Sequence, residues 1–345
     1  MKARQDPLET RLFSCFTPGS KVIAGLDGGL FSTLAAWAAN QAGAVVEGVA
    51  LRLYEEELTS AQKAADRLGI NLTVADYRAF FGEDVLSSYF SALKDGLALS
   101  SCAFCANRGR IAYLFNELMK LGGEKIVVGD IARIARWKDS YAVYRAKSGA
   151  DASRNLALAN PLTIPYLIMP LGEAESIDEL STLAKKLGFE MEPEREKPCF
   201  LNGKTYPIFP FESGVKGELI YRGEVLGVHS GVYTLQLGAR AAVDGDYYIS
   251  HIDALTGVVQ LSKKEELYKR ALRLINTTFR KDEPPISKVS ILVGKRYKKT
   301  PALLEIFFGG KAALMCKSPL FSPMRGEIAA IYSGERLIGG GVIDG

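Results

Sequence analysis

Three cysteines are the residues of this chain whose types and spacing could do chemistry. Cys102 and Cys105 form a C-x-x-C pair, and Cys199 stands far along the chain between a proline and a phenylalanine. A C-x-x-C pair at the start of a helix lies near the positive helix end. That position lowers the thiol pKa and favours the thiolate, the form that attacks sulfur or binds metal. Cys199 can join the pair only through the fold.

Several chemistries are open for these thiols. One thiol could carry a persulfide that another resolves, or the three could hold a 4Fe–4S cluster with one iron free. Zinc would need a fourth ligand, and His229 and His251 are the only histidines. The three could also be ordinary core residues. We expect buried, inert thiols at Cys15 and Cys316.

A glycine-containing loop near the N-terminus predicts an anion site. The stretch 21–33 reads as a short apolar strand, a loop and a helix start. Such a loop presents backbone N–H groups to phosphate, and the helix dipole adds to the attraction. The segment is neither a Walker loop nor G-x-G-x-x-G, and an ordinary strand–helix turn is the alternative. The residues predicted to contact a nucleotide are Gly25, Asp27, Gly28, Gly29, Ser32 and Thr33.

The first part of the chain alternates strand-like and helix-like patterns. This alternation predicts an α/β domain, a parallel sheet with helices on both faces. The strands are expected at 21–26, 45–54, 71–76 and 125–128. The helices are expected at 32–41, 59–68, 83–94, 107–121 and 176–187.

After Cys199 short Val-, Ile- and Tyr-rich runs recur between glycines, which predicts small β domains or barrels. The strands are expected at 217–221, 225–228, 247–252, 289–293, 303–308, 327–332 and 336–343. Residues 261–279 fit neither the helical nor the strand period. The acidic, proline-containing stretch 282–285 is the best linker candidate. We therefore expect an α/β domain at 1–200, a central β-rich domain at 201–283 and a C-terminal β-barrel domain at 284–345.

Composition and charge narrow the class of protein. The chain has 345 residues, about half of them apolar, which suits a globular protein of two or three domains. No run reaches the length of a membrane span, and the N-terminus has no apolar signal region. Five cysteines, an odd number, fit a reducing compartment. These features predict a cytoplasmic protein with no membrane partner.

One stretch of the chain is strongly basic. Between Lys263 and Lys299 there are twelve Lys or Arg against four Asp or Glu, while the whole chain carries +4. A basic segment on an otherwise slightly acidic chain favours a polyanion such as nucleic acid. Solvated surface charge is the alternative.

The motifs and their order resemble, nearly end to end, the tRNA-specific 2-thiouridylase family (MnmA/TrmU). The glycine loop lies where that family has its PP-loop S-G-G-x-D-S, and Cys199-Phe200 lies where it has its second essential cysteine. The other stretches that carry the resemblance are 102–111, 127–133 (compare A-T-G-H-Y-A-R), 169–187 (compare F-P-L-G), 223–234, 296–298 and 337–343.

The resemblance implies a Rossmann-like PP-loop ATPase fold and a reaction. ATP with Mg²⁺ would adenylate the C2 oxygen of a wobble uridine in tRNA, with Gly129 also near the nucleotide. A persulfide on Cys199, loaded by a sulfur-donor protein, would deliver sulfur, and Cys105 would release it by forming a disulfide. In members with a C-x-x-C plus a distant cysteine, a 4Fe–4S cluster held by Cys102, Cys105 and Cys199 is the alternative. The residues expected to bind RNA are Lys295, Arg296, Tyr297, Lys298 and Arg154.

The PP-loop is degenerate. Asp27 replaces its first Ser and places negative charge beside the phosphates, which is repulsive unless a cation intervenes. Phe31 replaces its Asp and removes a polar group expected near the pyrophosphate and Mg²⁺. Asp130 replaces the His of G-H-Y, Arg154-Asn155-Leu156 stands for K-D-Q, and G-Q-R-K-G is not recognisable.

Two rival functions follow from these departures. One is a paralogue that no longer adenylates and instead binds RNA, or carries sulfur or a cluster for a partner. The other is a redox or zinc-bound structural module.

Overall fold

The computed structural model describes residues 6–54, 58–98, 100–189, 214–293 and 298–345. The chain forms two compact units, which are described separately. The first comprises Met1–Asp84, Cys105–Glu194 and Glu335–Ile338, and the second comprises Val85–Phe104, Arg195–Gly334 and Gly339–Gly345. Among the described residues, no helix is long and apolar enough to cross a membrane.

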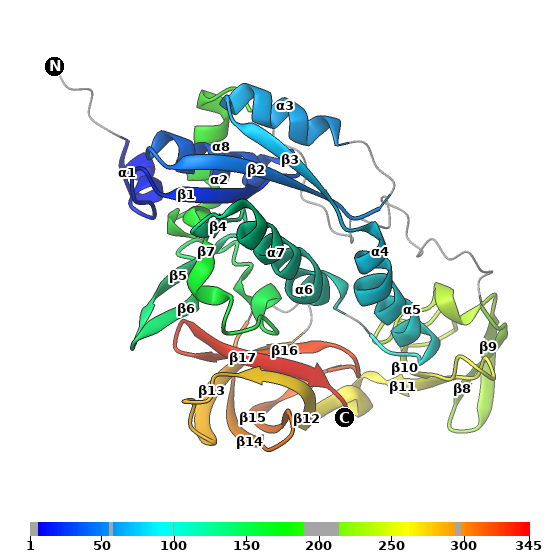
Figure 1. Ribbon diagram of the computed structural model, residues 1–345. Coiled ribbons are helices and arrows are strands. Elements are labelled where there is room, and N and C mark those ends of the chain that lie inside the picture. The colour runs from blue at the N-terminus through cyan, green and yellow to red at the C-terminus, as the bar shows by residue number, and fades with distance from the viewer. Residues whose placement is uncertain (1–5, 55–57, 99, 190–213, 294–297) are drawn as a thin grey trace. The chain divides into compact units, whose positions relative to one another are not determined.

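A five-stranded parallel sheet is the centre of the first unit (Figure 1). Its strand order is β3-β2-β1-β4-β7, and each neighbouring pair is parallel. The strands are β1 (Lys21–Gly25), β2 (Val45–Arg52), β3 (Asn71–Asp76), β4 (Lys125–Val127) and β7 (Leu167–Ile168). The parallel α/β sheet predicted from the alternating pattern is confirmed.

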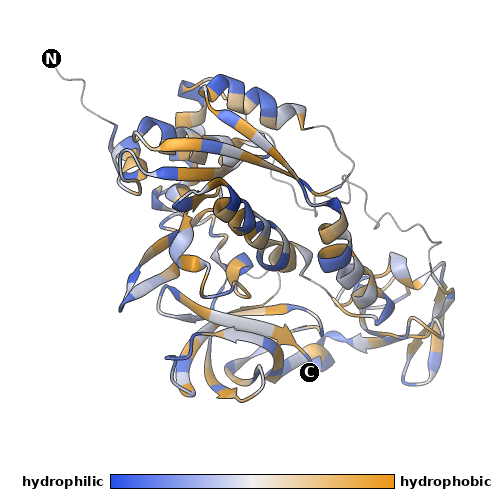
Figure 2. Cartoon of the chain, in the orientation of Figure 1, coloured by the Kyte–Doolittle hydropathy of each residue, from blue (hydrophilic) through white to orange (hydrophobic). Residues whose placement is uncertain are grey.

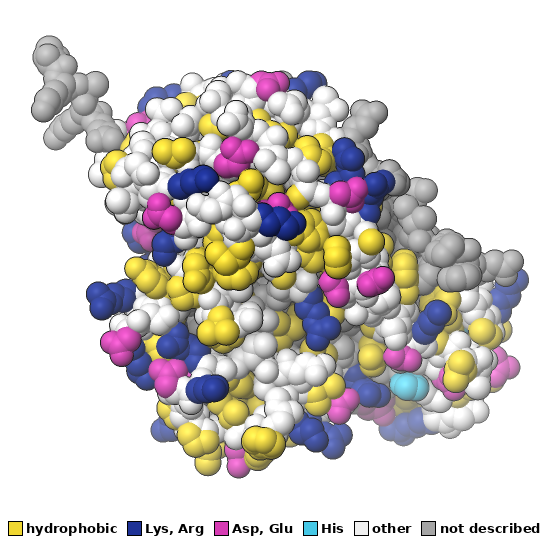
Figure 3. Space-filling view, viewed as in Figure 1, with side chains coloured by type: hydrophobic (Ala, Val, Ile, Leu, Met, Phe, Trp, Pro, Cys, Tyr) yellow, Lys and Arg dark blue, Asp and Glu magenta, His cyan; other side chains and the backbone are white. Residues whose placement is uncertain are grey.

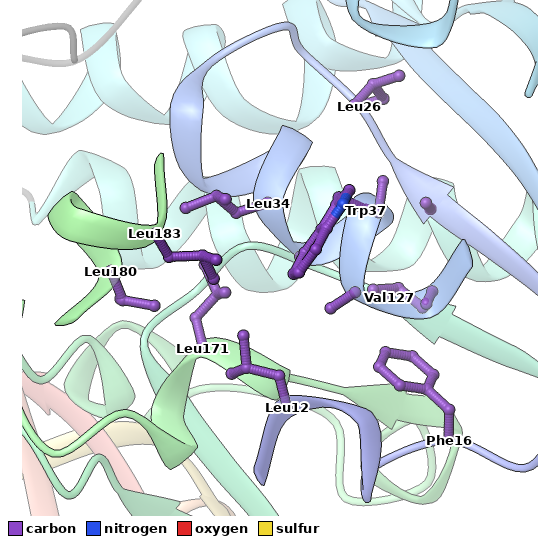
Figure 4. Packing of buried hydrophobic residues seen from close by; sticks show 14 of the residues in the cluster. Leu12, Phe16, Leu26, Leu34, Trp37, Val127, Leu171, Leu180 and Leu183 are labelled. Carbon is purple, nitrogen blue, oxygen red and sulfur yellow. The ribbon is translucent and has the colours of Figure 1, made fainter. Parts of the chain in front are cut away.

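Helices cover both faces of this sheet. On one face α2 (Leu30–Gln41) packs with α1 (Pro7–Phe13), α3 (Thr59–Leu68) and α8 (Ile177–Lys186) around one apolar cluster. Figure 4 shows Leu34, Leu180 and Leu183 of this cluster converging near Leu171. On the other face α7 (Ile111–Leu121) lies so close to β1 that a Cβ on Gly25 would come within 2.9 Å of the Leu114 side chain.

Helix ends in this unit follow their local chemistry. Gly69 ends α3 in the left-handed conformation at φ +66°, which glycine adopts without steric cost. The Ser176 hydroxyl accepts the Glu179 N–H at 3.2 Å and begins α8. In Figure 2 α3 and α7 carry both hydrophilic and hydrophobic colours, as expected of helices with one buried face.

An antiparallel hairpin of β5 (Ala132–Trp137) and β6 (Ser140–Arg145) follows β4. The sequence patterns did not predict it. Short helical turns η3 (Ser153–Leu156), η4 (Ile164–Tyr166) and η5 (Pro170–Glu173) lie between the hairpin and α8, and α4 (Arg78–Phe81) follows β3.

The second unit contains a four-stranded sheet with the order β10-β11-β8-β9. Its strands are β8 (Gly217–Tyr221), β9 (Glu224–His229), β10 (Tyr247–Ile252) and β11 (Val259–Lys263). Leu219, Ile249, Val259 and Leu261 form its core. The turn Arg222-Gly223 has φ values of +50° and +88°, as in the predicted hairpin turn.

The second unit also contains a closed six-stranded barrel, in which β12 pairs with both β15 and β17. The strands are β12 (Tyr268–Phe279), β13 (Ile286–Val293), β14 (Thr300–Phe307), β15 (Lys311–Phe321), β16 (Ile328–Ser333) and β17 (Arg336–Ile343). The predicted C-terminal barrel is confirmed. The stretch that fitted neither period includes β12, and β15 lies where no strand was predicted.

The predicted helices at 83–94 and 107–121 are each interrupted by a wider turn. A π-helical turn η1 (Gly82–Leu86) precedes α5 (Ser87–Lys94), and a second, η2 (Ala106–Arg110), separates α6 (Ser101–Cys105) from α7. The boundary between the two units falls inside α6, after Phe104.

Candidate functional site

The carboxyl ends of β1 and β4 lie side by side because the two strands are parallel neighbours. The glycine loop follows β1, and Gly129-Asp130 follows β4. Ligands of open α/β sheets bind at this edge. A Cβ on Gly129 would lie 2.6 Å from the Phe31 carbonyl carbon and the Ser32 nitrogen. Glycine at 129 is therefore needed for the close approach of this segment to the start of α2.

Asp27 occupies the anion position at the start of α2. Its Oδ1 accepts the Gly29 N–H at 2.9 Å and also the Ser32 hydroxyl. The Thr33 hydroxyl donates to the Gly29 carbonyl at 2.8 Å. The donors that a phosphate-binding loop offers to its ligand are thus used by a carboxylate of the loop itself, where the helix dipole favours negative charge.

The structure requires glycine at position 28 whether or not a ligand binds to the loop. Its φ is +81°, and a Cβ there would lie 2.3 Å from the Ser60 carbonyl carbon at the start of α3. Both the left-handed backbone and the tight packing require glycine. The loop is therefore held in its curve by α3.

A bidentate ion pair joins Arg110 to Asp130. The Nη1–Oδ2 distance is 2.7 Å and the Nη2–Oδ1 distance is 2.8 Å. The Asp130 side chain is 11% exposed and that of Arg110 is 32% exposed. Fork-to-fork pairing of this kind fixes orientation as well as distance. The pair therefore fixes the end of η2 against the carboxyl end of β4.

The surroundings of Arg110 connect the loop to the cysteine helix. Burial alone would lower the pKa of the Arg110 guanidinium, but attraction to Asp130, and then to Cys105 and Asp27, raises it above its usual value. Asp130 pairs directly with this cation, and Asp27 and Cys105 are close enough to act on its charge.

The π-helical turn η2 joins Cys105, the last residue of α6, to the start of α7. The Ile111 N–H bonds to the Ala106 carbonyl, a five-residue step. Such wide turns are frequent at functional sites. The Asn107 side chain donates to the Asn155 carbonyl at 2.9 Å and ties η2 to η3.

The predicted sulfur residues are placed only in part. Cys102 is exposed and Cys105 is half-buried, and both lie in α6. Cys199 lies outside the described residues, so its approach to the pair stays a prediction. No group of three His, Cys, Asp or Glu side chains able to hold a metal occurs in the described part of the chain.

The other two cysteines have environments that suppress reactivity. Burial raises the pKa of the Cys15 thiol to about 12, with Glu173 adding to the rise and Lys147 opposing it. Cys316 is buried, and burial raises its pKa as well. The expectation of a buried thiol is confirmed for Cys316, and its inertness stays a prediction. Cys15 is half-buried but also stays protonated near neutral pH.

The predicted RNA-binding residues fall into two groups. Lys295, Arg296 and Tyr297 lie outside the described residues. Lys298 is exposed just before β14, and Arg154 is half-buried in η3. Their contact with RNA stays a prediction.

Comparison with known families decides which family this arrangement belongs to. The family model described as the tRNA methyl transferase HUP domain matches residues 20–203, more than half of the chain. The chain belongs to this family. The match spans the parallel sheet, the glycine loop and the C-x-x-C pair.

Relatives of this family member match it almost end to end. The tRNA-specific 2-thiouridylase MnmA of Acidithiobacillus ferrooxidans is 28% identical over 94% of this chain and 98% of its own. That of Helicobacter pylori is 26% identical over 94% of this chain and 99% of its own. The resemblance to the MnmA/TrmU family is therefore confirmed. The solved structure of NMN synthetase from Francisella tularensis shares 16% identity and covers 53% of this chain and 70% of its own, at a TM-score of 0.33, which carries no functional conclusion.

Arg110 is the site residue that the sequence analysis did not identify. One signal was available, because Asp130 replaces a His of the family pattern and a new carboxylate at that edge requires a cation. The partner could not be chosen from the sequence, because two arginines, Arg108 and Arg110, follow Cys105.

Asp130→Asn is expected to lower the free energy of unfolding by about 2 kcal/mol, because a partly buried guanidinium loses its carboxylate. Asp76→Asn is the matched control. It weakens the more exposed pair with Arg78, whose N–O distance is also 2.7 Å, and should cost clearly less because solvent screens the two charges. Urea unfolding measures both, and equal losses would contradict the structural importance of the Arg110–Asp130 pair.

Cys102 is expected to react with iodoacetamide at pH 8 in the reduced, iron-free protein, whereas Cys15 and Cys316 should not. With a pKa of about 12, the Cys15 thiolate fraction at that pH is roughly one in ten thousand. Mass spectrometry of peptides over a time course gives the rates. Labelling of Cys15 as fast as Cys102 would contradict the burial and the raised pKa of the Cys15 thiol.

Proposed function

We propose that the protein transfers sulfur to C2 of a tRNA uridine in an ATP-dependent reaction. Membership of the family and end-to-end similarity to curated 2-thiouridylases support this proposal. One structural observation carries it to particular residues. Gly129-Asp130 after β4 lies against the end of the predicted nucleotide loop after β1, and Asp130 pairs with Arg110 at the end of the turn that follows Cys105, a predicted sulfur-transfer thiol.

The proposed chemistry proceeds in three balanced steps. The uridine C2 oxygen attacks the α-phosphorus of ATP, and pyrophosphate leaves. The terminal sulfur of a Cys199 persulfide then attacks C2, and AMP leaves with the former C2 oxygen. Finally the Cys105 thiolate attacks Sγ of Cys199 and breaks the S–S bond. This leaves a C2 thiocarbonyl and a Cys105–Cys199 disulfide. A sulfur-donor protein and a reductant would restore the persulfide.

No step is routed through an iron–sulfur cluster. The described residues supply two of the three thiolates that the cluster alternative requires, Cys102 and Cys105, and no third ligand beside them. The names of the curated relatives do not support the alternative of a paralogue without the adenylation step.

ATP binding at this loop must overcome the Asp27 carboxylate. A phosphate at the start of α2 competes with the Asp27 carboxylate for the Gly29 N–H and the Ser32 hydroxyl. It also meets the charge of that carboxylate. Binding therefore requires either that Asp27 moves aside or that Mg²⁺ neutralises the repulsion.

Cys105→Ser and Cys199→Ser are each expected to abolish 2-thiolation of a tRNA transcript, because serine can neither hold a persulfide nor form the disulfide. Cys316→Ser is the control and should keep activity. Retardation of the product in a mercury-containing gel measures thiolation. Cys102→Ser separates the two routes, since the persulfide route survives it, whereas a cluster would lose iron along with activity. Wild-type activity in Cys105→Ser would overturn the assignment.

Asp27→Ser is expected to tighten ATP binding about tenfold in calorimetry, because it removes a negative charge beside the phosphates. Asp6→Ser is the matched control. Asp6 Oδ1 also accepts an N–H two residues on, at 2.9 Å from Leu8, but at the start of α1. It should leave ATP binding unchanged. Weaker binding of Mg²⁺–ATP by Asp27→Ser would instead mean that Asp27 holds the cation.

A further inference from the structure

The β5–β6 hairpin of the first unit has no role in the chemistry proposed above. Residues 132–147 include five Lys or Arg and a single acidic residue, Asp139. Figure 3 shows Lys and Arg side chains beside hydrophobic ones, with a few acidic groups, at the left rim, where Figure 1 places β5 and β6. The turn consists of Lys138 and Asp139, since Trp137 pairs with Ser140.

Cations and aromatic rings alternate at the end of this hairpin. The Lys138 Nζ lies 4.2 Å and the Arg336 guanidinium carbon 3.8 Å from the Trp137 ring centroid. Arg136 stands opposite Tyr141 in the register, and Tyr141 is 40% exposed. We call Arg136, Trp137, Lys138 and Tyr141 the hairpin tip. Arg136 and Lys138 are exposed, and Trp137 is half-buried.

Lys138 has an unfavourable backbone for its type. Its φ is +52°, a region where glycine or asparagine costs less than lysine. Arg222 has a similar φ of +50° at the turn of the β8–β9 hairpin, and its ion pair with Glu266 at 2.7 Å gives it a structural role. At Lys138 the strained turn instead places the lysine ammonium against the indole ring of Trp137. Backbone strain of this kind is typical of functional positions.

A purely structural explanation accounts for only part of these facts. β5 stands at the end of its strand order, and charged residues on an end strand prevent pairing with other chains. That explains Arg136. The contact with the buried Arg336 gives Trp137 a structural role as well. Neither fact explains a lysine at a left-handed turn position or the exposed Tyr141 ring.

We propose that the hairpin tip binds RNA. Arg136 and Lys138 contact phosphates, and the exposed Tyr141 ring, which stands opposite Arg136, stacks on an unpaired base, the combination that single-stranded RNA surfaces use. The Trp137 ring, in contact with Lys138 and Arg336, supports the turn. An acidic protein would use the cations but has no base to stack on Tyr141. The proposal deepens the proposed function and rests on it, because the RNA is the tRNA substrate.

The test measures binding of an unmodified tRNA transcript with uridine at the wobble position, across a series of salt concentrations. Arg136→Gln with Lys138→Asn should raise Kd about tenfold near 0.1 M salt and make the salt slope shallower by about two. Asparagine suits the positive φ, so thermal stability should hold or rise. Tyr141→Leu should raise Kd at least about fivefold with the slope unchanged.

The control is Lys63→Gln with Lys185→Gln, which removes the same charge from α3 and α8 of the same unit, where both lysines are exposed. It should bind like the wild type. If the wild type binds no tRNA, the proposed function itself fails. If the wild type binds and the tip variant binds equally well, only the hairpin proposal is overturned. The hairpin proposal is also overturned if the tip variant no longer binds an acidic sulfur-donor protein but binds tRNA as well as the wild type does.

Discussion

The ion pair between Arg110 and Asp130 joins the helical segment that carries Cys105 to the carboxyl end of β4. Because the pairing is bidentate, at 2.7 and 2.8 Å, it constrains direction as well as distance. A partly buried ion pair is on average no more stable than well-packed apolar groups, so stability alone does not explain it. Its consequence is positional. It sets where the thiol one turn before Arg110 lies relative to the loop.

The same cation explains how the altered loop can exist. A carboxylate at the start of α2 is stabilised by the helix dipole, by the Gly29 N–H and by the nearby guanidinium. Phe31, which stands where the family pattern has Asp, packs against the apolar cluster around α2. The loop has therefore moved its carboxylate from the first turn of the helix to the turn before it. The Asp27 carboxylate already takes the Gly29 N–H and the Ser32 hydroxyl, and a nucleotide must compete with it for these two donors.

Much of the fold followed from local patterns, and the failures have physical causes. The limits of α3 and β3 matched because a helical period ends at Gly69 and a short β run ends before α4. Residues 261–279 fitted neither period because they combine the end of β11, the short turn η8 (Lys264–Leu267) and β12, which shifts register between Lys269 and Ala271 and again between Ile275 and Thr278. Such shifts interrupt the two-residue alternation of a strand. The β5–β6 hairpin was not predicted because cations interrupt its apolar alternation.

The sequence predicted which kinds of residue form the candidate site, but not which side chains pair with one another. The loop and the cysteines carry local signals, whereas Arg110 and Asp130 are twenty residues apart and meet only through the fold. The wide η2 turn also shifts every later side chain on the helix, which a regular helical period does not anticipate.

The chain order connects the proposed RNA surface to the site. Asp130 is followed almost at once by β5, and the Ala132 N–H bonds to the Asp130 carbonyl at 3.0 Å. The base of β5 is held by η5, where a Cβ on Gly172 would lie 1.9 Å from the Ala132 carbonyl oxygen. Six extended residues span roughly 20 Å, so the hairpin tip would contact nucleotides other than the target uridine. A strand anchored at the residue that positions Cys105 would then hold the RNA backbone at a fixed spacing from the reacting thiol.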